Sequence, residues 1–465
     1  MARSWAPGGA RDRAAQDPKE PTVTRCTPHR TTPRSSTTPH RTTSPRTTSL
    51  AAARRGTAVL AVGLSALFAG SGLAAAQSAD AGSVTGSLTG LLGDRANPSL
   101  GLGSTGDTGS AGSLGFVPPM PAGPQVRVET VLDGLSIPWD VAVDPTGVVL
   151  TGERDSGRIH AVFPDGRKAL VAADLGRLRT GGESGLMSLA PAADFSTTRE
   201  VYTCHSDAGA NDNRVLAWRA TPDWSRLESP RVVVSGLPMS DSGRHAGCRV
   251  LAHPDGTLYI GTGDALSGPG PQSLDSLAGK ILHVTRNGEP ASGDHPGTIV
   301  HSRGHRNVQG LAVQPGTGRI YSAEHGPDVD DEMNLVVGDA NYGWDPDRGG
   351  AYDQSVPMTD LRKFPDAVRA VWSSGAPTLA PSGMGFLDHP SWGAWNGSAV
   401  LAGLKSERLV LLSLSPDGTR VERTAAILQG TNGRLRSVTP APDGSLLVTT
   451  SNGGGRDSVL RVRPA

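Results

Sequence analysis

Three short polar stretches carry most of the residues whose types and spacing could support chemistry in this 465-residue sequence. The stretch GRHAGCR contains His245, and an imidazole can exchange a proton near neutral pH. GHRNVQG and EHGPDVDDEMN together place Arg306 near a run of carboxylates, and oxygen atoms are the ligands that calcium prefers. LKSER and NGRLR supply Lys405, Arg434 and Arg436, which could hold an anion. These residue types belong to sites of proton transfer, cation binding and anion binding.

Each stretch also fits a purely structural role. His245 could be a surface histidine after a loop, and Arg306 could form a salt bridge within its own loop. The acidic run at 328–332 could be only a solvated loop. Arg434 and Arg436 are two residues apart, so on an extended strand they share a face and could simply be exposed cations.

A recurring strand–turn–strand unit must position these stretches. It appears as WDVAVDPTGVVLTGE, RVLAHPDGTLYIGTGD, GLAVQPGTGRIYSAE and RSVTPAPDGSLLVTT, and a second hairpin often follows, as in GRIHAVFPDG, GKILHVTRNG and RLVLLSLSPDG. Four-stranded units repeated around an axis make a propeller, and roughly 340 residues hold about six of them. We therefore predict an all-β fold, a six-bladed β-propeller of four-stranded blades, over an array of β-sandwiches. Loops at one face of a propeller line its channel, which would bring the polar stretches together.

The chain divides by composition into four parts. Residues 1–52 are crowded with Arg, Thr, Ser and Pro and predict a disordered extension, or a segment that is untranslated if the true start lies further on. Residues 53–77 combine a basic flank, an apolar core and an Ala-Ala-Ala end, which favours a secretory signal peptide over a transmembrane anchor. Residues 78–124 read as a Gly/Ser-rich linker and 125–465 as the propeller domain. A secreted or extracytoplasmic location follows.

Charge and cysteine content narrow the class of protein further. The formal net charge is +0, which gives no reason to expect a nucleic acid as partner. Of the three cysteines, Cys26 lies in the N-terminal extension, while Cys204 and Cys248 form an even pair in a chain with an export signal. We expect a disulfide between them, with two buried free thiols as the alternative.

The run SRGHRNVQGLAVQPGTGRIYSAEHGPDVDDEMNLVVGDANYGWDP resembles the central signature of the PQQ-dependent sugar dehydrogenases, also called the glucose/sorbosone dehydrogenase family. The resemblance continues in IPWDVAVDPTG, GERDSGRI, GGESGLMSLA, SLAGKILHV, APSGMGF, LAGLK and GRLRSVTPAPDG, and so covers nearly all of residues 126–465. It implies a six-bladed propeller that binds PQQ at the mouth of its channel, uses calcium and oxidises the anomeric hydroxyl of aldoses to lactones.

The resemblance also assigns roles to residues. His245 stands where the family has its general base. Arg306 and Asn307 match paired cofactor contacts, and the guanidinium would stabilise charge that develops on the quinone oxygen as hydride arrives. The cations that match those facing the three carboxylates of PQQ are Lys405, Arg434 and Arg436, and further candidates for the cofactor wall are Tyr352, Ala380, Pro381 and Ser382.

The calcium assignment rests on four positions. Gly326 and Pro327 stand where backbone carbonyls of the family hold the ion that accompanies the cofactor. Glu332 and Tyr342 match positions linked to calcium in the aldose dehydrogenase branch. Tyr342 would serve through its carbonyl, because a neutral phenol is a poor calcium ligand.

Two residues depart from the family pattern. Glu183 stands where many members have glutamine, and a carboxylate beside an anionic cofactor would be repelled unless it pairs with Arg306 or is protonated. Arg244 precedes the proposed base where the glucose-oxidising branch has an acid that could orient the imidazole. The substrate preference of that branch is therefore not carried over to this chain.

Together these features predict an oxidoreductase that transfers hydride from an aldose to PQQ, which an external electron acceptor then reoxidises. The alternatives are a calcium-dependent lactonase or hydrolase propeller and a non-catalytic carbohydrate-binding propeller. The former does not require the cations Lys405, Arg434 and Arg436, and Glu183 favours the latter. The sequence points to no particular sugar, acceptor or oligomeric state.

Overall fold

A computed structural model describes residues 117–291 and 297–465, which belong to one compact unit. The predicted N-terminal extension, the signal peptide and most of the linker lie outside the described residues. Within the described ranges the only helices are α1 (Phe195–Thr198) and the 3₁₀ helix η1 (Pro390–Trp395). No helix in these ranges is long and apolar enough to cross a membrane.

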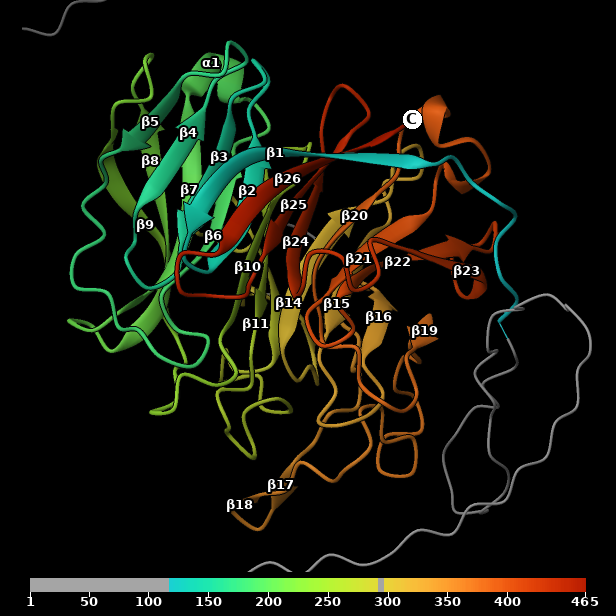
Figure 1. Cartoon of the computed structure of the whole chain (residues 1–465). Helices are drawn as coiled ribbons and strands as arrows, with labels where there is room; N and C mark the ends of the chain where they lie inside the picture. The colour runs from blue at the N-terminus through green and yellow to red at the C-terminus, as the bar shows by residue number, and fades with distance from the viewer. Residues whose placement is uncertain (1–116, 292–296) are drawn as a thin grey trace, which may run out of the picture. The chain divides into compact units, whose positions relative to one another are not determined.

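Six four-stranded antiparallel sheets make up this structure, and we call them blades 1 to 6 (Figure 1). Blades 1 to 3 are β2 (Pro138–Val143), β3 (Val149–Glu153), β4 (Ile159–Val162) and β5 (Lys168–Val171); β6 (Leu186–Pro191), β7 (Glu200–Asp207), β8 (Asp212–Ala220) and β9 (Leu227–Leu237); and β10 (Gly247–Ala252), β11 (Leu258–Thr262), β12 (Lys280–Val284) and β13 (Val300–Arg303).

Blades 4 to 6 are β14 (Val308–Val313), β15 (Ile320–Glu324), β16 (Glu332–Leu335) and β19 (Trp372–Ser373); β20 (Pro381–Phe386), β21 (Ala399–Gly403), β22 (Arg408–Leu414) and β23 (Val421–Ile427); and β24 (Leu435–Pro440), β25 (Leu446–Thr450), β26 (Asp457–Pro464) and β1 (Val126–Leu135). A separate small hairpin, β17 (Asp347–Arg348) with β18 (Ala351–Tyr352), follows β16.

The blades close into a ring around their first strands. The strands β2, β6, β10, β14, β20 and β24 each contact the first strand of the next blade, and β24 contacts β2. Apolar side chains fill the space between neighbouring blades, as where Val250 and Ile260 of blade 3 share a core with Val215 of blade 2. The predicted six-bladed propeller is therefore confirmed.

The N-terminal part of the described chain completes the ring. Strand β1 is the outermost strand of blade 6 and pairs with β26 from Val126 opposite Pro464 onward. The preceding residues add to the edge of blade 5, where the Met120 N–H donates to the Thr424 carbonyl over 2.8 Å. Blade 6 is thus built from both ends of the described chain.

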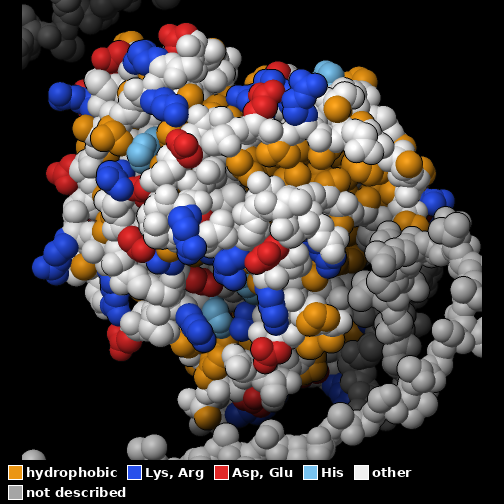
Figure 2. Space-filling model, in the orientation of Figure 1, with side chains coloured by type: hydrophobic (Ala, Val, Ile, Leu, Met, Phe, Trp, Pro, Cys, Tyr) orange, Lys and Arg blue, Asp and Glu red, His pale blue; other side chains and the backbone are white. Residues whose placement is uncertain are grey.

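The repeated units of the sequence are the first two strands of blades 1, 3, 4 and 6. Their turns hold glycine in the left-handed region, with φ 87° at Gly147 and φ 88° at Gly256, which favours glycine over other residues. In blades 2 and 5 the same connection contains α1 and η1 instead. Figure 2 shows acidic and basic side chains interspersed over the face that it draws.

A β-bulge interrupts the pairing of every first strand with the second strand of its blade. In β2, β14 and β24 the bulge skips Trp139, Gln309 and Arg436 respectively, and in β10 it skips Cys248. A bulge re-aims a side chain and bends its strand. Three of these re-aimed side chains, those of Trp139, Gln309 and Arg436, line the cavity described next.

Candidate functional site

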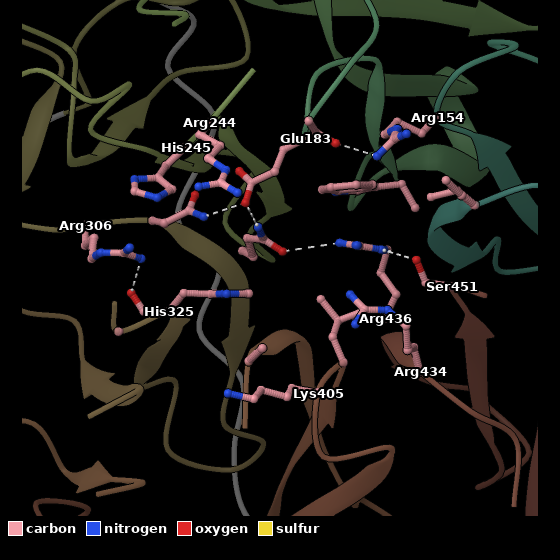
Figure 3. Close-up of a pocket in the computed structure, with 18 of the residues that line it drawn as sticks. Arg154, Glu183, Arg244, His245, Arg306, His325, Lys405, Arg434, Arg436 and Ser451 are labelled. Carbon is pink, nitrogen blue, oxygen red and sulfur yellow. Dashed lines mark hydrogen bonds between the residues drawn. The ribbon is translucent and has the colours of Figure 1, made fainter. Parts of the chain in front are cut away.

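A cavity of about 700 Å³ lies where the first strands of the blades begin and the second strands end (Figure 3). All six blades contribute to its wall. The predicted site residues that line it are Glu183, His245, Arg306, Asn307, Gly326, Pro327, Ala380, Lys405, Arg434 and Arg436. The structure therefore brings together residues that are widely separated in the sequence.

His245 is held by a carboxylate that the sequence analysis did not identify. The imidazole is 7% exposed, and its Nδ1 lies 2.8 Å from Oδ1 of Asp264, just after β11. Because Asp264 engages Nδ1, the other ring nitrogen, Nε2, is the one that can take a proton from a bound molecule. The pair has the geometry of an oriented general base.

Asp264 is fully buried and its carboxylate accepts hydrogen bonds on both oxygens. Trp344 Nε1 and the Tyr352 hydroxyl donate to Oδ2 over 2.8 and 2.7 Å. Burial alone would raise the pKa of Asp264, but its interactions with His245, the Tyr352 hydroxyl and the Leu266 N–H together lower that pKa below its ordinary value. Tyr352, predicted as part of the cofactor wall, thus supports Asp264 and does not line the cavity.

Glu183 is tied to its neighbours through three neutral donors. Its Oε2 accepts from the backbone N–H of Ala246 over 2.7 Å. Its Oε1 accepts from Asn307 Nδ2 and Gln309 Nε2, each over 2.9 Å. Beside an anionic cofactor this carboxylate was predicted to pair with Arg306 or to be protonated, whereas its hydrogen-bond partners among the described residues are these three N–H groups. Glu183 thereby fixes the loop that carries His245.

Arg306 and Asn307 lie side by side at the start of β14 with different partners. The Asn307 Oδ1 accepts from the N–H of Gly247 over 3.0 Å, so both ends of this amide are engaged within the protein. Arg306 is 4% exposed and donates from Nη1 to the His325 carbonyl over 2.9 Å. Its Nε is buried without a partner among the described residues. A donor left in this way can serve a group bound in the cavity.

Three cations form the opposite wall of the cavity from His245 (Figure 3). Lys405 and Arg434 are exposed, and neither side chain forms an ion pair with any described residue. Arg436 is 6% exposed, lies 3.6 Å over the Trp139 ring and donates from Nε to Ser451. Burial, together with the neighbouring cation Arg434, lowers the pKa of Arg436 to about 9. An anion bound here would relieve the repulsion among these cations.

His325 also lines the cavity and was not singled out from the sequence. It follows β15, and its Nε2 is buried without a partner among the described residues. Burial and the nearby guanidinium of Arg306 hold its pKa well below the ordinary value, so the ring is neutral. A neutral imidazole can accept or donate one hydrogen bond from this position.

The predicted calcium positions separate into two places. Gly326 and Pro327 line the cavity, whereas Glu332 and Tyr342 lie buried outside its wall. Glu332 faces Glu324 across the sheet, and burial together with Glu324 raises the pKa of Glu332 to about 8. The Tyr342 hydroxyl donates to the Leu335 carbonyl over 2.5 Å, so its phenol is engaged elsewhere.

Oxygen atoms beside Glu332 remain available to a cation. Asn334 donates from Nδ2 to both Glu324 and Glu332, while its Oδ1 is buried without a partner among the described residues. Two carboxylates and an unpartnered amide oxygen suit a hard ion such as calcium. In the described part of the chain no three His, Cys, Asp or Glu residues are grouped as metal ligands.

The other predicted wall residues surround one turn. Ala380 lines the cavity, Pro381 is buried at the start of β20, and the Ser382 hydroxyl donates to Gln309 Oε1 over 2.9 Å. Ser382 therefore supports Gln309, which also donates to Glu183.

The predicted disulfide between Cys204 and Cys248 is present. It joins β7 of blade 2 to β10 of blade 3, three residues after His245, and both sulfur-bearing residues are fully buried. The bond therefore fixes the strand that follows the His245 loop to the neighbouring blade.

Comparisons with known proteins identify the family of the chain. A family model described as glucose/sorbosone dehydrogenase matches residues 135–461. The aldose sugar dehydrogenase of Escherichia coli strain K12 is 28% identical over 361 residues, which cover 73% of this chain and 93% of that protein. The PQQ-bound structure of an aldose sugar dehydrogenase from Streptomyces coelicolor is 33% identical with a TM-score of 0.62, over 74% of this chain and 100% of that one.

An oxidoreductase of Thermus thermophilus, described as a glucose dehydrogenase, is 37% identical with a TM-score of 0.62, over 73% of this chain and 100% of that one. The family match spans most of the propeller and includes every cavity-lining residue that the sequence predicted. This chain therefore belongs to the glucose/sorbosone dehydrogenase family and is an oxidoreductase.

Proposed function

We propose that this protein oxidises the anomeric hydroxyl of an aldose to a lactone, with PQQ as its cofactor. The observation that carries the proposal is one cavity that holds both an oriented base, His245 with Asp264, and an anion site. The PQQ-bound relative from Streptomyces coelicolor supports the choice of cofactor.

The anion site fits PQQ by charge and by size. Three carboxylates need several cations, and Lys405, Arg434 and Arg436 lack carboxylate partners among the described residues. A cavity of about 700 Å³ lies within the range of cofactor and ligand pockets, roughly 300–1,000 Å³. It would leave room for a sugar beside the cofactor.

The residues of the opposite wall would carry the proton chemistry. His245 Nε2 would take the proton of the sugar C1 hydroxyl, while Asp264 stabilises the resulting imidazolium through Nδ1–H. When bound, PQQ supplies the quinone that accepts the hydride from C1. Arg306, with its unpartnered Nε, would stabilise negative charge near that quinone.

Calcium belongs to the same proposal. Gly326 and Pro327 would offer backbone carbonyls at the cavity wall, where the ion would act as a Lewis acid and fix the cofactor. The buried oxygens around Glu332 and Asn334 form a second candidate position. Tyr342 would contribute only its carbonyl, since its hydroxyl is engaged.

We further propose that the protein is exported and passes electrons to an external acceptor. The apolar segment at 53–77 has the pattern of a signal peptide. A buried disulfide is typical of proteins that fold in an oxidising compartment.

Reconstitution tests the function. Purified protein with PQQ and calcium should reduce a dye when aldoses are added, and His245→Ala should lower turnover by about 10²–10⁴-fold without a comparable loss of PQQ affinity. His253→Ala is the matched control, because His253 lies at a turn on the same blade outside the cavity. Dye reduction that is absent with every aldose, or unaffected by His245→Ala, would favour a hydrolase or binding propeller.

A further inference from the structure

Arg244 has no partner in a cavity whose carboxylates are already engaged. Its side chain is exposed and lines the cavity directly before His245. Among the described residues its guanidinium forms neither an ion pair nor a hydrogen bond. The backbone beneath it is fixed, since Ser240 donates to the Arg244 carbonyl and the Glu183 N–H donates to the Gly243 carbonyl over 3.0 Å. The Arg244 guanidinium thus lacks a partner among the described residues, while the backbone that carries it is held by hydrogen bonds.

The nearby acidic side chains form no ion pair with Arg244 and are hydrogen-bonded to other groups. Glu183 accepts three hydrogen bonds, and Asp264 is saturated by His245 and its neighbours. The cavity-lining Arg154 already has its own carboxylate, because Nε and Nη2 donate to Asp155 over 2.6 and 2.9 Å. Arg244 is therefore a cation beside the base whose entire guanidinium lacks a hydrogen-bond or ion-pair partner among the described residues.

This cation is separate from the proposed cofactor cations. Figure 3 shows Arg244 beside His245 on one side of the cavity, with Lys405 and Arg434 on the other. Arg244 lies in the loop between blades 2 and 3, whereas the anion site comes from blades 5 and 6. An anion that meets Arg244 would accordingly belong to the molecule that meets His245.

We propose that the substrate is an aldose that bears an anionic group, a carboxylate or a phosphate, and that Arg244 binds this group. The inference rests on the proposed function and names its substrate class. A guanidinium binds either group through paired N–H donors, so it would set the orientation in which the C1 hydroxyl faces His245 Nε2. The reaction is unchanged: the hydroxyl proton goes to His245, the hydride goes to the quinone, and the anionic group does not react.

Paired substrates test the proposal in the holoenzyme with PQQ and calcium. For each charged sugar, kcat/KM is divided by the value for its neutral counterpart, with one dye throughout. The pairs are glucuronate and glucose, galacturonate and galactose, and glucose 6-phosphate and glucose. Any effect of Arg244 on the dye then cancels. Wild type should favour at least one charged member by about 10- to 100-fold, as expected for hydrogen bonds between charged groups. The uronates and the phosphate ester show which anion is recognised.

Variants connect the preference to Arg244. Arg244→Gln should abolish it, and Arg244→Glu should reverse it in favour of neutral sugars. Arg127→Gln is the matched control, since Arg127 is exposed on the outermost strand β1, and it should keep the wild-type ratio. Neutral sugars oxidised without any preference, or a preference that survives Arg244→Gln, would overturn this inference and leave the proposed function intact. Failure to oxidise any sugar would overturn both.

Discussion

His245 and Asp264 lie 19 residues apart and meet because β10 leaves the cavity and β11 returns to it. Asp264 follows β11 just as Glu324 ends β15 and Glu153 ends β3. The sequence contains this regularity, since GTGD, YSAE and LTGE all close a repeated unit. Aligning the repeats could have identified Asp264 as a residue at the channel mouth, although the contact with His245 depends on the fold.

We expect Asp264→Asn to lower kcat by about 10²–10⁴-fold, because the amide no longer fixes the imidazole tautomer or stabilises its charged form. The dissociation constant for PQQ should change little, since the cofactor cations lie on the opposite wall. Turnover and PQQ titration of the reconstituted protein give both quantities. Asp255→Asn changes a turn carboxylate of the same blade and serves as the control. Normal turnover in Asp264→Asn would remove Asp264 from the proton-transfer machinery.

For other residues, the position relative to the cavity could not be predicted from the sequence, and each case has a physical reason. Gln309 and Arg436 line the cavity because a bulge re-aims each of them, and a bulge has no composition signal of its own. Glu183 is held by three neutral N–H groups from other segments, and such a convergence leaves no local sequence signal. Tyr352 supports Asp264 instead of lining the cavity, which reflects the course of an irregular segment.

At the scale of secondary-structure elements, loop 264–279 is organised around one buried lysine, whose pKa is lowered to about 7 by burial and by Arg303. Lys280 begins β12, is fully buried and donates from Nζ to the carbonyls of Gly270, Pro271 and Ala278. Three acceptors around one nitrogen require the three donors of an ammonium group. Carbonyl groups of the loop between Asp264 and β12 thus surround the lysine nitrogen, as carbonyl ligands surround a bound metal ion.

Lys280→Met should destabilise the protein by about 3 kcal/mol or more, because three buried carbonyls lose their donor at about 1–3 kcal/mol each. Turnover should also fall, since the loop begins at the carboxylate that orients His245. Denaturant unfolding and dye reduction measure the two effects. Lys168→Met, on the exposed edge strand β5, should leave both unchanged. Unaltered unfolding of Lys280→Met would show that the loop holds without its ammonium.

The strand–turn–strand unit could be predicted from the sequence in every blade where a short turn joins the first two strands. Blades 1, 3, 4 and 6 showed it in the sequence, whereas α1 and η1 interrupt it in blades 2 and 5. The number of blades, six, was still predicted correctly from the length of the domain. Closure of blade 6 by β1 could not be read from the pattern, because pairing between distant strands has no local signal.

At the scale of the whole molecule, the bond between Cys204 and Cys248 joins two blades. It closes a loop with a sequence separation of 44, for which the chain-entropy model gives about 4 kcal/mol of stabilisation. The double variant Cys204→Ala, Cys248→Ala should therefore unfold at lower denaturant concentration. A thiol count of denatured, unreduced wild-type protein is the control, and it should find at most the thiol of Cys26. Equal unfolding midpoints would show that the disulfide contributes no stability.

The pairing of β1 with β26 dictates the order in which the molecule can be assembled. Blades 1 to 5 each come from one contiguous stretch, but blade 6 needs Val126 and Pro464 at once. A growing chain can form an open arc of blades, and it cannot complete blade 6 before β26 is available to pair with β1. The cavity wall includes Trp139 near one end of the ring and Arg436 near the other, in contact at 3.6 Å. The cavity wall consequently needs the first and the last blade together, because neither blade alone supplies both Trp139 and Arg436.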